Sequence, residues 1–571
     1  MRAMLVAAAA AAAAGRSGVR AQGPSPAQLA AESIRVLRKA HNAQSSFELY
    51  RRNRLPERRS DGAQACDARV GRYCYWRGDD DDEQPPPEKS EVVERRNSLL
   101  ALLDSSVRAL PGDAWLAGQS VRYLAESGRA DDAIRYARTD CRAAAGWCSA
   151  LAGYAAHVGG RFAAADSEFT KALAAMDTVE RARWLDFDDE LEDHLHDRLD
   201  TLRMEARQAL ARRIMWMGSP LLSISGTDLW TEHMARFTRT LIAEHAASTE
   251  GGTWDDSDRE LTMRYGWPTW FSRERPDFAS MSEPRMTGHD SGRPYNFFPS
   301  EHAVDHVGHI GADDWSLDDS RARYGYGPRY ARSVHDLPHQ IARFRRGDST
   351  LVVAAWDGRR DTTLLGRTLN VALVLASGPD HMIVSRDSSP RAIGRISTTG
   401  VIDSGLVSLE VLAVADRRAA RAREGIPARV STTVTLSDLL LYAPGLESPH
   451  GLDAVRDSAM TSDVVTGQKS AGVFWEIYGL AAAKTPVHYT LTLEPVDVGW
   501  LRQIAEKLRF ADPTRALRVQ WDDVPEIANG VGSRGVKIDV SQLRPSRYRL
   551  RVSVDAPGEL SAISEREIEI R

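Results

Sequence analysis

The sequence predicts a multidomain α+β protein with an N-terminal helical layer, a central mixed segment and a C-terminal antiparallel β-sandwich. Its 571 residues are too many for one compact core. Residues 92–215 carry helical patterning with an internal repeat. Across residues 346–571, short runs that alternate apolar and polar residues are separated by Gly, Pro and Asp turns, which is typical of antiparallel strands.

Residues 1–21 have the pattern of a secretory signal peptide. Arg2 supplies the positive start, residues 3–14 form a short apolar run, and Val19 and Ala21 stand at the −3 and −1 positions of a cleavage site. The run is too short to span a bilayer, and no later window of about 18 residues is apolar throughout. We therefore expect cleavage after Ala21, a periplasmic or secreted protein, and no transmembrane segment after cleavage.

Residues 22–91 form an N-terminal segment that ends in a linker. The stretch from Pro26 to Leu49 favours a helix. An acidic run at 79–83 then leads into three prolines at 85–87. Such composition is typical of a solvated linker and lacks the glycine and glutamate spacing of a calcium loop.

Residues 92–215 contain a repeat that predicts paired helices. The stretch Gly128–Ala133 recurs 32 residues later as Gly160–Ala165. Each glycine closes one helix and opens the next. Gly153, Phe169 and Ala172 stand where tetratricopeptide repeats place a glycine, an aromatic residue and an alanine, so the domain resembles one such hairpin with a degenerate neighbour. Two repeats are too few for a free solenoid, and the layer should therefore pack on the rest of the chain.

The central segment, residues 216–345, contains a recognisable motif. Trp254 is followed by Arg264-Tyr265-Gly266 and Pro268, and this stretch resembles the signature of the GWxTD-domain proteins, a family of bacterial secreted-type proteins. Positions 253, 256, 257 and 259 differ from the family pattern. The segments 437–441 and 475–480 are also similar, so the resemblance covers about 210–571. It implies an architecture and no reaction.

The same resemblance, together with the alternation of Leu261 and Met263, predicts a short strand over Glu260–Arg264. Trp254 and Tyr265 would then close over a small core. Gly266 is expected to take a backbone conformation that favours glycine.

Alternating residues define the C-terminal strands. Tyr548, Leu550, Val552 and Val554 alternate with polar residues, and residues 487–493 and 536–540 do the same. The spacing fits one β-sandwich or two small ones. Two stretches interrupt the pattern: 500–510 is expected to be a helix, and 415–423 a solvent-facing helix or a long loop.

The four cysteines form two close couples, Cys66 with Cys74 and Cys141 with Cys148. Four cysteines allow three pairings, and we favour pairing within each couple in an exported protein. Neither couple has the spacing of a structural zinc site.

One histidine cluster has metal-ligand spacing. His302, Asp305 and His306 follow the order of inverted zincins, and His309 lies one turn beyond. On a helix the three imidazoles would share a face, with Asp305 and Asp313 as outer partners. Aspartate replaces the usual glutamate, and Gly308 and Gly311 weaken a helix there. We therefore favour a structural role, with no catalytic residue and no cofactor.

The preferred function is a non-enzymatic scaffold or binding protein of the cell envelope, with a protein or an envelope polymer as partner. A net charge of −5, a pI near 6.3 and the absence of a basic block argue against nucleic acid. The aromatic residues of 267–271 and 324–330 would either bind a partner or fill the seam between the two halves. The alternative is a metal-dependent hydrolase built on His302, His306 and His309.

The mature chain is expected to begin at Gln22 and to carry no free thiol. Intact mass and thiol titration of denatured protein from the native host measure both properties. The mass of the whole 571-residue chain, or four reactive thiols, would contradict this prediction.

Overall fold

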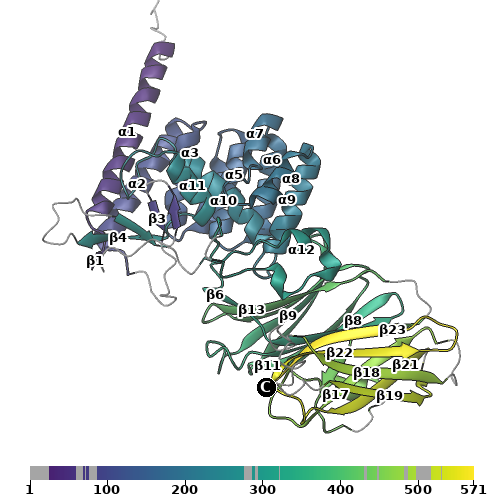
Figure 1. Cartoon of the computed structure of the whole chain (residues 1–571). Coiled ribbons are helices and arrows are strands. Elements are labelled where there is room, and N and C mark those ends of the chain that lie inside the picture. Colours follow the sequence, from purple (N-terminus) through teal and green to yellow (C-terminus); the bar gives the residue numbers. More distant parts are fainter. Residues whose placement is uncertain are drawn as a thin grey trace, which may run out of the picture.

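A helical layer is followed by two β-sandwiches in this computed structural model (Figure 1). The structure describes residues 25–59, 68–70, 73–75, 86–275, 286–289, 294–319, 322–429, 434–446, 449, 451–480, 486–496, 516–528 and 530–571. The expected signal peptide, the acidic run at 79–83 and the expected helix at 500–510 lie outside these residues.

Eleven helices of four or more residues precede residue 266 in the described part of the chain. They are α1 (Pro26–Arg52), α2 (Ser90–Ala109), α3 (Ala114–Glu126), α4 (Ala130–Arg135), α5 (Ala145–Val158), α6 (Phe162–Ala175), α7 (Thr178–Trp184), α8 (Asp193–Asp200), α9 (Met204–Gly218), α10 (Asp228–Ala243) and α11 (Asp256–Tyr265). A π-helical turn, Tyr136–Asp140, extends α4. Ser25 and Gln28 form a capping box that starts α1 close to the predicted position. No helix among the described residues is both long and apolar enough to cross a membrane.

The predicted repeat forms two helical hairpins, α3–α4 and α5–α6. Gly128 and Gly160 stand at the two turns with φ values of +73° and +71°, a conformation that favours glycine. A Cβ at Gly153 would lie 2.8 Å from the ring of Phe169, so the glycine lets α5 and α6 pack closely. The predicted N-terminal helical layer is confirmed.

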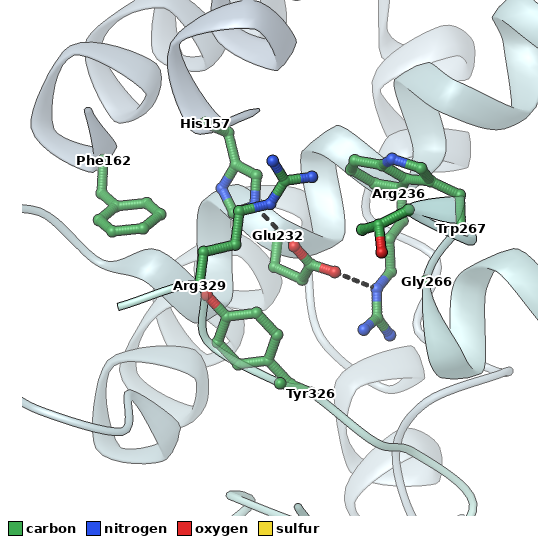
Figure 2. A pocket seen from close by; sticks show the side chains of 10 residues that line it. His157, Phe162, Glu232, Arg236, Gly266, Trp267, Tyr326 and Arg329 are labelled. Atoms are coloured by element: carbon green, nitrogen blue, oxygen red, sulfur yellow. Dashed lines mark hydrogen bonds and ion pairs between the residues drawn. The ribbon is translucent and has the colours of Figure 1, made fainter. Parts of the chain in front are cut away.

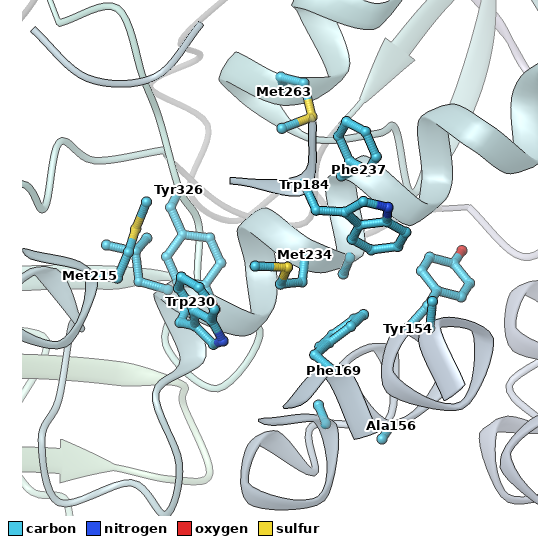
Figure 3. Close-up of a cluster of buried hydrophobic side chains, with 14 of the residues drawn as sticks. Tyr154, Ala156, Phe169, Trp184, Met215, Trp230, Met234, Phe237, Met263 and Tyr326 are labelled. Carbon is cyan, nitrogen blue, oxygen red and sulfur yellow. The ribbon is translucent and has the colours of Figure 1, made fainter. Parts of the chain in front are cut away.

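The central segment is divided between the two halves of the molecule. The boundary expected at residue 215 lies inside α9, and α10 and α11 belong to the helical layer. Met234 and Phe237 of α10 pack beside Trp184 and Phe169 in one hydrophobic core (Figure 3). That core extends along the chain from Ala117 to Ala419.

The strand predicted over Glu260–Arg264 is wrong, because these residues belong to helix α11. Asp255 caps the helix by accepting hydrogen bonds from the Ser257 and Asp258 amides. The buried positions 258, 262 and 265 follow helical spacing, and this outweighs the short alternation that suggested a strand.

The other described elements before the first sandwich are a small sheet, a separate strand pair and three short helical turns. The sheet contains β1 (Glu57–Arg59), β4 (Trp270–Arg275) and β5 (Met286–His289), and a separate pair joins β2 (Ala68–Val70) to β3 (Tyr73–Tyr75). The turns are α12 (Glu301–Asp305), η2 (Val307–His309) and η3 (Ala312–Asp314).

The first β-sandwich faces a five-stranded sheet, in the order β10-β9-β12-β13-β6, against a three-stranded sheet, β11-β8-β7. Its strands are β6 (Ser333–Asp336), β7 (His339–Arg346), β8 (Ser349–Asp357), β9 (Leu369–Gly378), β10 (His381–Ser389), β11 (Ile393–Gly400), β12 (Gly405–Ala413) and β13 (Arg418–Ile426). The helix or loop expected over 415–423 is therefore wrong. Ala420 and Ala422 alternate with Arg421 and Arg423 along a strand inside the sheet.

The second sandwich has its own core between sheets β14-β17-β21-β20, joined by β15, and β16-β23-β22-β18-β19. Its strands are β14 (Thr435–Leu436), β15 (Leu440–Tyr442), β16 (Val464–Val465), β17 (Ser470–Tyr478), β18 (Val487–Pro495), β19 (Leu517–Asp523), β20 (Glu526–Ala528), β21 (Val531–Asp539), β22 (Ser546–Asp555) and β23 (Ala562–Ile570), with helix α13 (Leu452–Arg456) between β15 and β16. Of the two predicted alternatives, one sandwich or two small ones, the structure has two, and Phe344 and Phe474 pack between them.

Buried charges join the helical layer to the first sandwich. Arg423 of β13 donates hydrogen bonds to the carbonyls of Met217 and Ser219, and Arg421 donates to those of Ser219 and Pro220. These carbonyls lie at the C-terminus of α9, where helical partners run out and the helix dipole favours a cation.

Glu410 of β12 carries the opposite charge and joins the same two segments. Its two carboxylate oxygens accept hydrogen bonds from the Leu222 and Ser223 amides at 2.7 and 2.9 Å. Burial lowers the pKa of the Arg423 guanidinium to about 10, so the group stays charged at neutral pH. We call Arg421, Arg423 and Glu410 the arginine clamp.

Replacing Arg423 with methionine is expected to destabilise the protein by about 3–5 kcal/mol, because the change leaves the buried Met217 carbonyl without its donor and removes a charge close to the buried Glu410 carboxylate. Denaturant unfolding measures this loss. Arg391→Met, at an exposed turn of the same sandwich, is the matched control. Equal stabilities of the two variants would contradict a structural role for the clamp.

Candidate functional site

The three candidate metal-binding histidines do not share a helical face. Helix α12 ends at Asp305, so His302 lies on it while His306 and His309 lie in the turn that follows. The ring centroids of His302 and His306 are 5.2 Å apart. Asp314, and not the expected Asp313, bonds to His302 Nδ1 at 3.1 Å, while Asp305 pairs with Arg198. The arrangement assumed for the zinc site is therefore wrong.

The predicted pairing of Cys141 with Cys148 is confirmed by a disulfide between them. It closes the turn between the π-helical end of α4 and helix α5. Cys66 and the side chain of Cys74 lie outside the described residues, so pairing within that couple stays a prediction.

The end of the motif, residues 264–266, lies beside a buried arginine of α10, Arg236. Its guanidinium donates hydrogen bonds to the carbonyls of Met263, Arg264 and Gly325 at 2.7, 2.9 and 2.8 Å. Gly266 follows at the end of α11 with a φ of +82°, as predicted. Tyr265 is buried, whereas Trp254 and Pro268 are half-buried. The motif thus connects α11 to the loop that contains Gly325.

A line of polar groups leads from Arg236 into the helical hairpins (Figure 2). Glu232 accepts from Arg236 Nε at 2.6 Å and lies 2.6 Å from His157 Nε2. Although burial opposes it, the neighbouring Arg236 and His157 lower the pKa of Glu232 to about 2. The cavity beside these groups has a volume of about 30 Å³, enough for a water or two and too small for an organic ligand. This region is structural.

The larger cavity is an acidic cleft of about 450 Å³ between the α7–α8 loop and residues 296–324. Six carboxylates and one arginine line it, together with two histidines, a tyrosine and several apolar or small residues. The charged and titratable members are Glu190, Glu192, His194, Glu301, His302, Asp313, Asp314, Asp319 and Arg323. We call this cavity the acidic cleft. Such a preponderance of one charge favours a cationic ligand.

Glu190 is the buried carboxylate of the acidic cleft, with an exposed fraction of 2%. Its Oε1 lies 2.8 Å from Nδ1 of His233, whose Nε2 lies 2.9 Å from the Trp184 carbonyl. Both of these oxygens act as acceptors, so the imidazole donates from both nitrogens and carries a positive charge. Although burial opposes it, the Glu190 carboxylate raises the pKa of His233. His233 therefore orients the Glu190 carboxylate.

Tyr324 is the second buried polar residue of the cleft, with an exposed fraction of 1%. The Arg236 guanidinium lies 4.6 Å from the centre of one ring face, and Phe298 packs at 4.8 Å. Tyr324 and Tyr326 thus pack between the two halves of the molecule, which is one of the two roles predicted for the aromatic residues of 324–330. Tyr324 nevertheless also lines the acidic cleft.

One group of side chains among the described residues could hold a metal ion: Asp186, Asp188 and His196. Their ligand atoms lie within 4.8 Å of one another. Asp188 is exposed, and His196 also contacts Asp200. The group lies on the outer side of the loop that supplies Glu190. It is separate from the histidines that sequence spacing indicated.

Sequence reasoning missed the residues that matter most in this site. Glu190 belongs to a run of acidic residues over 186–193, and neither Glu190 nor His233 belongs to a recognisable motif. The available signal was position: Phe187 and Leu191 flank Glu190 at spacings that bury one side of the run.

No protein-family model and no curated protein matches this chain. Among solved structures, the chain is similar to the crystal structure of the chicken CNTN1 FN1–FN3 domains. The identity is 14%, the match covers 42% of this chain and 67% of that chain, and the TM-score is 0.15. At this TM-score the two chains do not share an overall arrangement, and we base no functional argument on the likeness.

The buried Asp228 gives a pH-dependent contribution to stability. Burial raises the pKa of this carboxyl to about 6, despite a hydrogen bond from the Tyr330 hydroxyl at 2.7 Å. An acid with a raised pKa binds its proton more tightly in the folded state. Its contribution to the free energy of unfolding therefore falls as pH rises through about 6.

Between about pH 5 and about pH 7, wild type should lose roughly 1 kcal/mol of stability relative to Asp228→Asn. Denaturant unfolding of both proteins at the two pH values measures this difference. The pH dependence of the titratable groups that the two proteins share cancels in it. A difference that stays constant or rises with pH would be inconsistent with a raised pKa.

Proposed function

We propose that this protein is an exported, non-enzymatic binding protein of the cell envelope that takes a basic ligand in the acidic cleft. The observation that carries the proposal is the lining of the cleft, in which six carboxylates face a single arginine in a cavity of about 450 Å³. Excess negative charge in a concave site raises the local concentration of cations and favours their binding.

The export part of the proposal has separate support. The signal-like residues 1–21, the resemblance to GWxTD-domain proteins over residues 252–268 and the Cys141–Cys148 disulfide all agree with an oxidising compartment. Two β-sandwiches joined to a helical layer add extended surfaces of a kind that many binding proteins use, although the fold alone does not decide function.

The geometry favours binding over the hydrolase alternative. His302, His306 and His309 are exposed and lie on a helix and a following turn. A hydrolytic zinc site requires imidazoles fixed around one point by outer partners. The acidic cleft instead combines apolar walls with carboxylates spread around its mouth, which suits an organic cation.

The double variant Glu301→Lys/Asp313→Lys tests the proposal at two exposed residues of the cleft mouth. The probe is the peptide acetyl-Gly-Lys-Gly-Lys-Gly-amide, measured by calorimetry at low salt. Reversing two nearby charges should weaken its binding about thirtyfold, since together they remove on the order of 2 kcal/mol.

The control Asp453→Lys/Asp457→Lys makes the same change in net charge at exposed positions of the second sandwich. It should bind the peptide like wild type. Equal weakening in both double variants would show that net charge alone drives binding, and the proposed site would then be wrong.

A further inference from the structure

The acidic cleft has a polar floor beneath its charged mouth. Glu192, Glu301, His302 and Asp313 are exposed at the mouth, whereas Glu190 and Tyr324 are almost fully buried. Within the part of the chain that the structure describes, neither Glu190 Oε2 nor the Tyr324 hydroxyl has a hydrogen-bond partner. Buried polar atoms without partners are uncommon in folded proteins and call for an explanation.

Both floor groups are held in place by their other contacts. His233 bonds the opposite oxygen of Glu190, which fixes the plane of the carboxylate. Arg236 and Phe298 pack on the ring of Tyr324, which fixes the direction of its hydroxyl. Both residues line the cleft, and these contacts limit how far each side chain can turn, as a preorganised binding site requires.

The walls above the floor are apolar. Leu195, Phe298 and Pro299 line the cleft and are buried. An apolar passage that leads from an acidic mouth to two acceptor oxygens matches a long basic side chain, whose methylene stem is apolar and whose end donates hydrogen bonds.

A bare metal ion fits this floor less well. The possible metal-binding group among the described residues consists of Asp186, Asp188 and His196, which do not line the acidic cleft. A ligand that reaches the floor must also bring several N–H donors to two separate oxygens, which an ammonium or guanidinium group does.

We infer that the acidic cleft binds a lysine or arginine side chain of a partner polypeptide, whose terminal N–H groups donate to Glu190 Oε2 and the Tyr324 hydroxyl. This inference rests on the proposed function, because the mouth must attract a cation before the floor selects one with N–H donors.

Two probes of equal charge test it on the full-length protein. Nα-acetyl-lysine amide carries three N–H donors on its side-chain ammonium, whereas its Nζ-trimethyl form keeps the charge and the stem but has no N–H on the side chain. Wild type should bind the first about tenfold or more tightly than the second, since hydrogen bonds to charged groups contribute at least that ratio. Tyr324→Phe should reduce this preference several-fold, and Glu190→Gln should reduce it further.

Tyr326→Phe is the matched control, because Tyr326 lies two residues away and does not line the acidic cleft. It should keep the preference of wild type. Thermal melting reports whether Glu190→Gln still folds; if it does not, Tyr324→Phe, which keeps the packed ring, decides the question.

The outcomes separate the two proposals. Equal affinity of wild type for the two probes, or an unchanged preference in Tyr324→Phe, overturns the assignment of the floor while the charge dependence of the mouth still supports the proposed function. If neither probe nor the lysine peptide binds wild type, both the further inference and the proposed function are overturned.

Discussion

The arrangement of this protein depends on a few buried charges that complete the end of one helix. The last carbonyls of α9 have no partner inside the helix, and Arg421 and Arg423 of β13 supply donors from the neighbouring sheet. Around this contact, Trp216 and Met217 pack on Leu406 of β12. The guanidinium groups of both arginines also lie over the ring of Trp315, so the clamp supports the segment that forms one wall of the acidic cleft.

Arg236 has the same role on the other side of the acidic cleft. It joins the end of α11 to the Gly325 carbonyl and supports the ring of Tyr324. Buried charges of this kind contribute little net stability compared with apolar packing, but they accept few alternative partners. We therefore regard Arg236 as a positioning residue. Residues 264–266 of the motif that resembles the GWxTD signature lie beside it, which gives these residues a structural role without assigning them any chemistry.

Local patterns in the sequence predicted the elements and failed at the contacts between them. The glycines at 128 and 160 and the alternation in β22 each report on neighbours within a few residues, and the helical hairpins and strands follow from them. The charged residues of β13 suggested exposure, although their alternation with Ala420 and Ala422 also indicated a strand. The floor of the acidic cleft joins Glu190 to Tyr324, and no local pattern reports a contact across that separation.

The core shared between the two halves also has a consequence for how the chain folds as it is made. Residues of the helical layer, such as Trp230, pack in one cluster with Val334 and Ala419, which leave the ribosome much later. The early helices therefore keep apolar surface uncovered until β13 has been synthesised, and a long loop must close before that surface is buried. The second sandwich has a core drawn from residues 434–570 alone, although Phe474 also packs on Phe344 of the first sandwich. The helical layer therefore depends on residues that are made much later, whereas the core of the second sandwich does not.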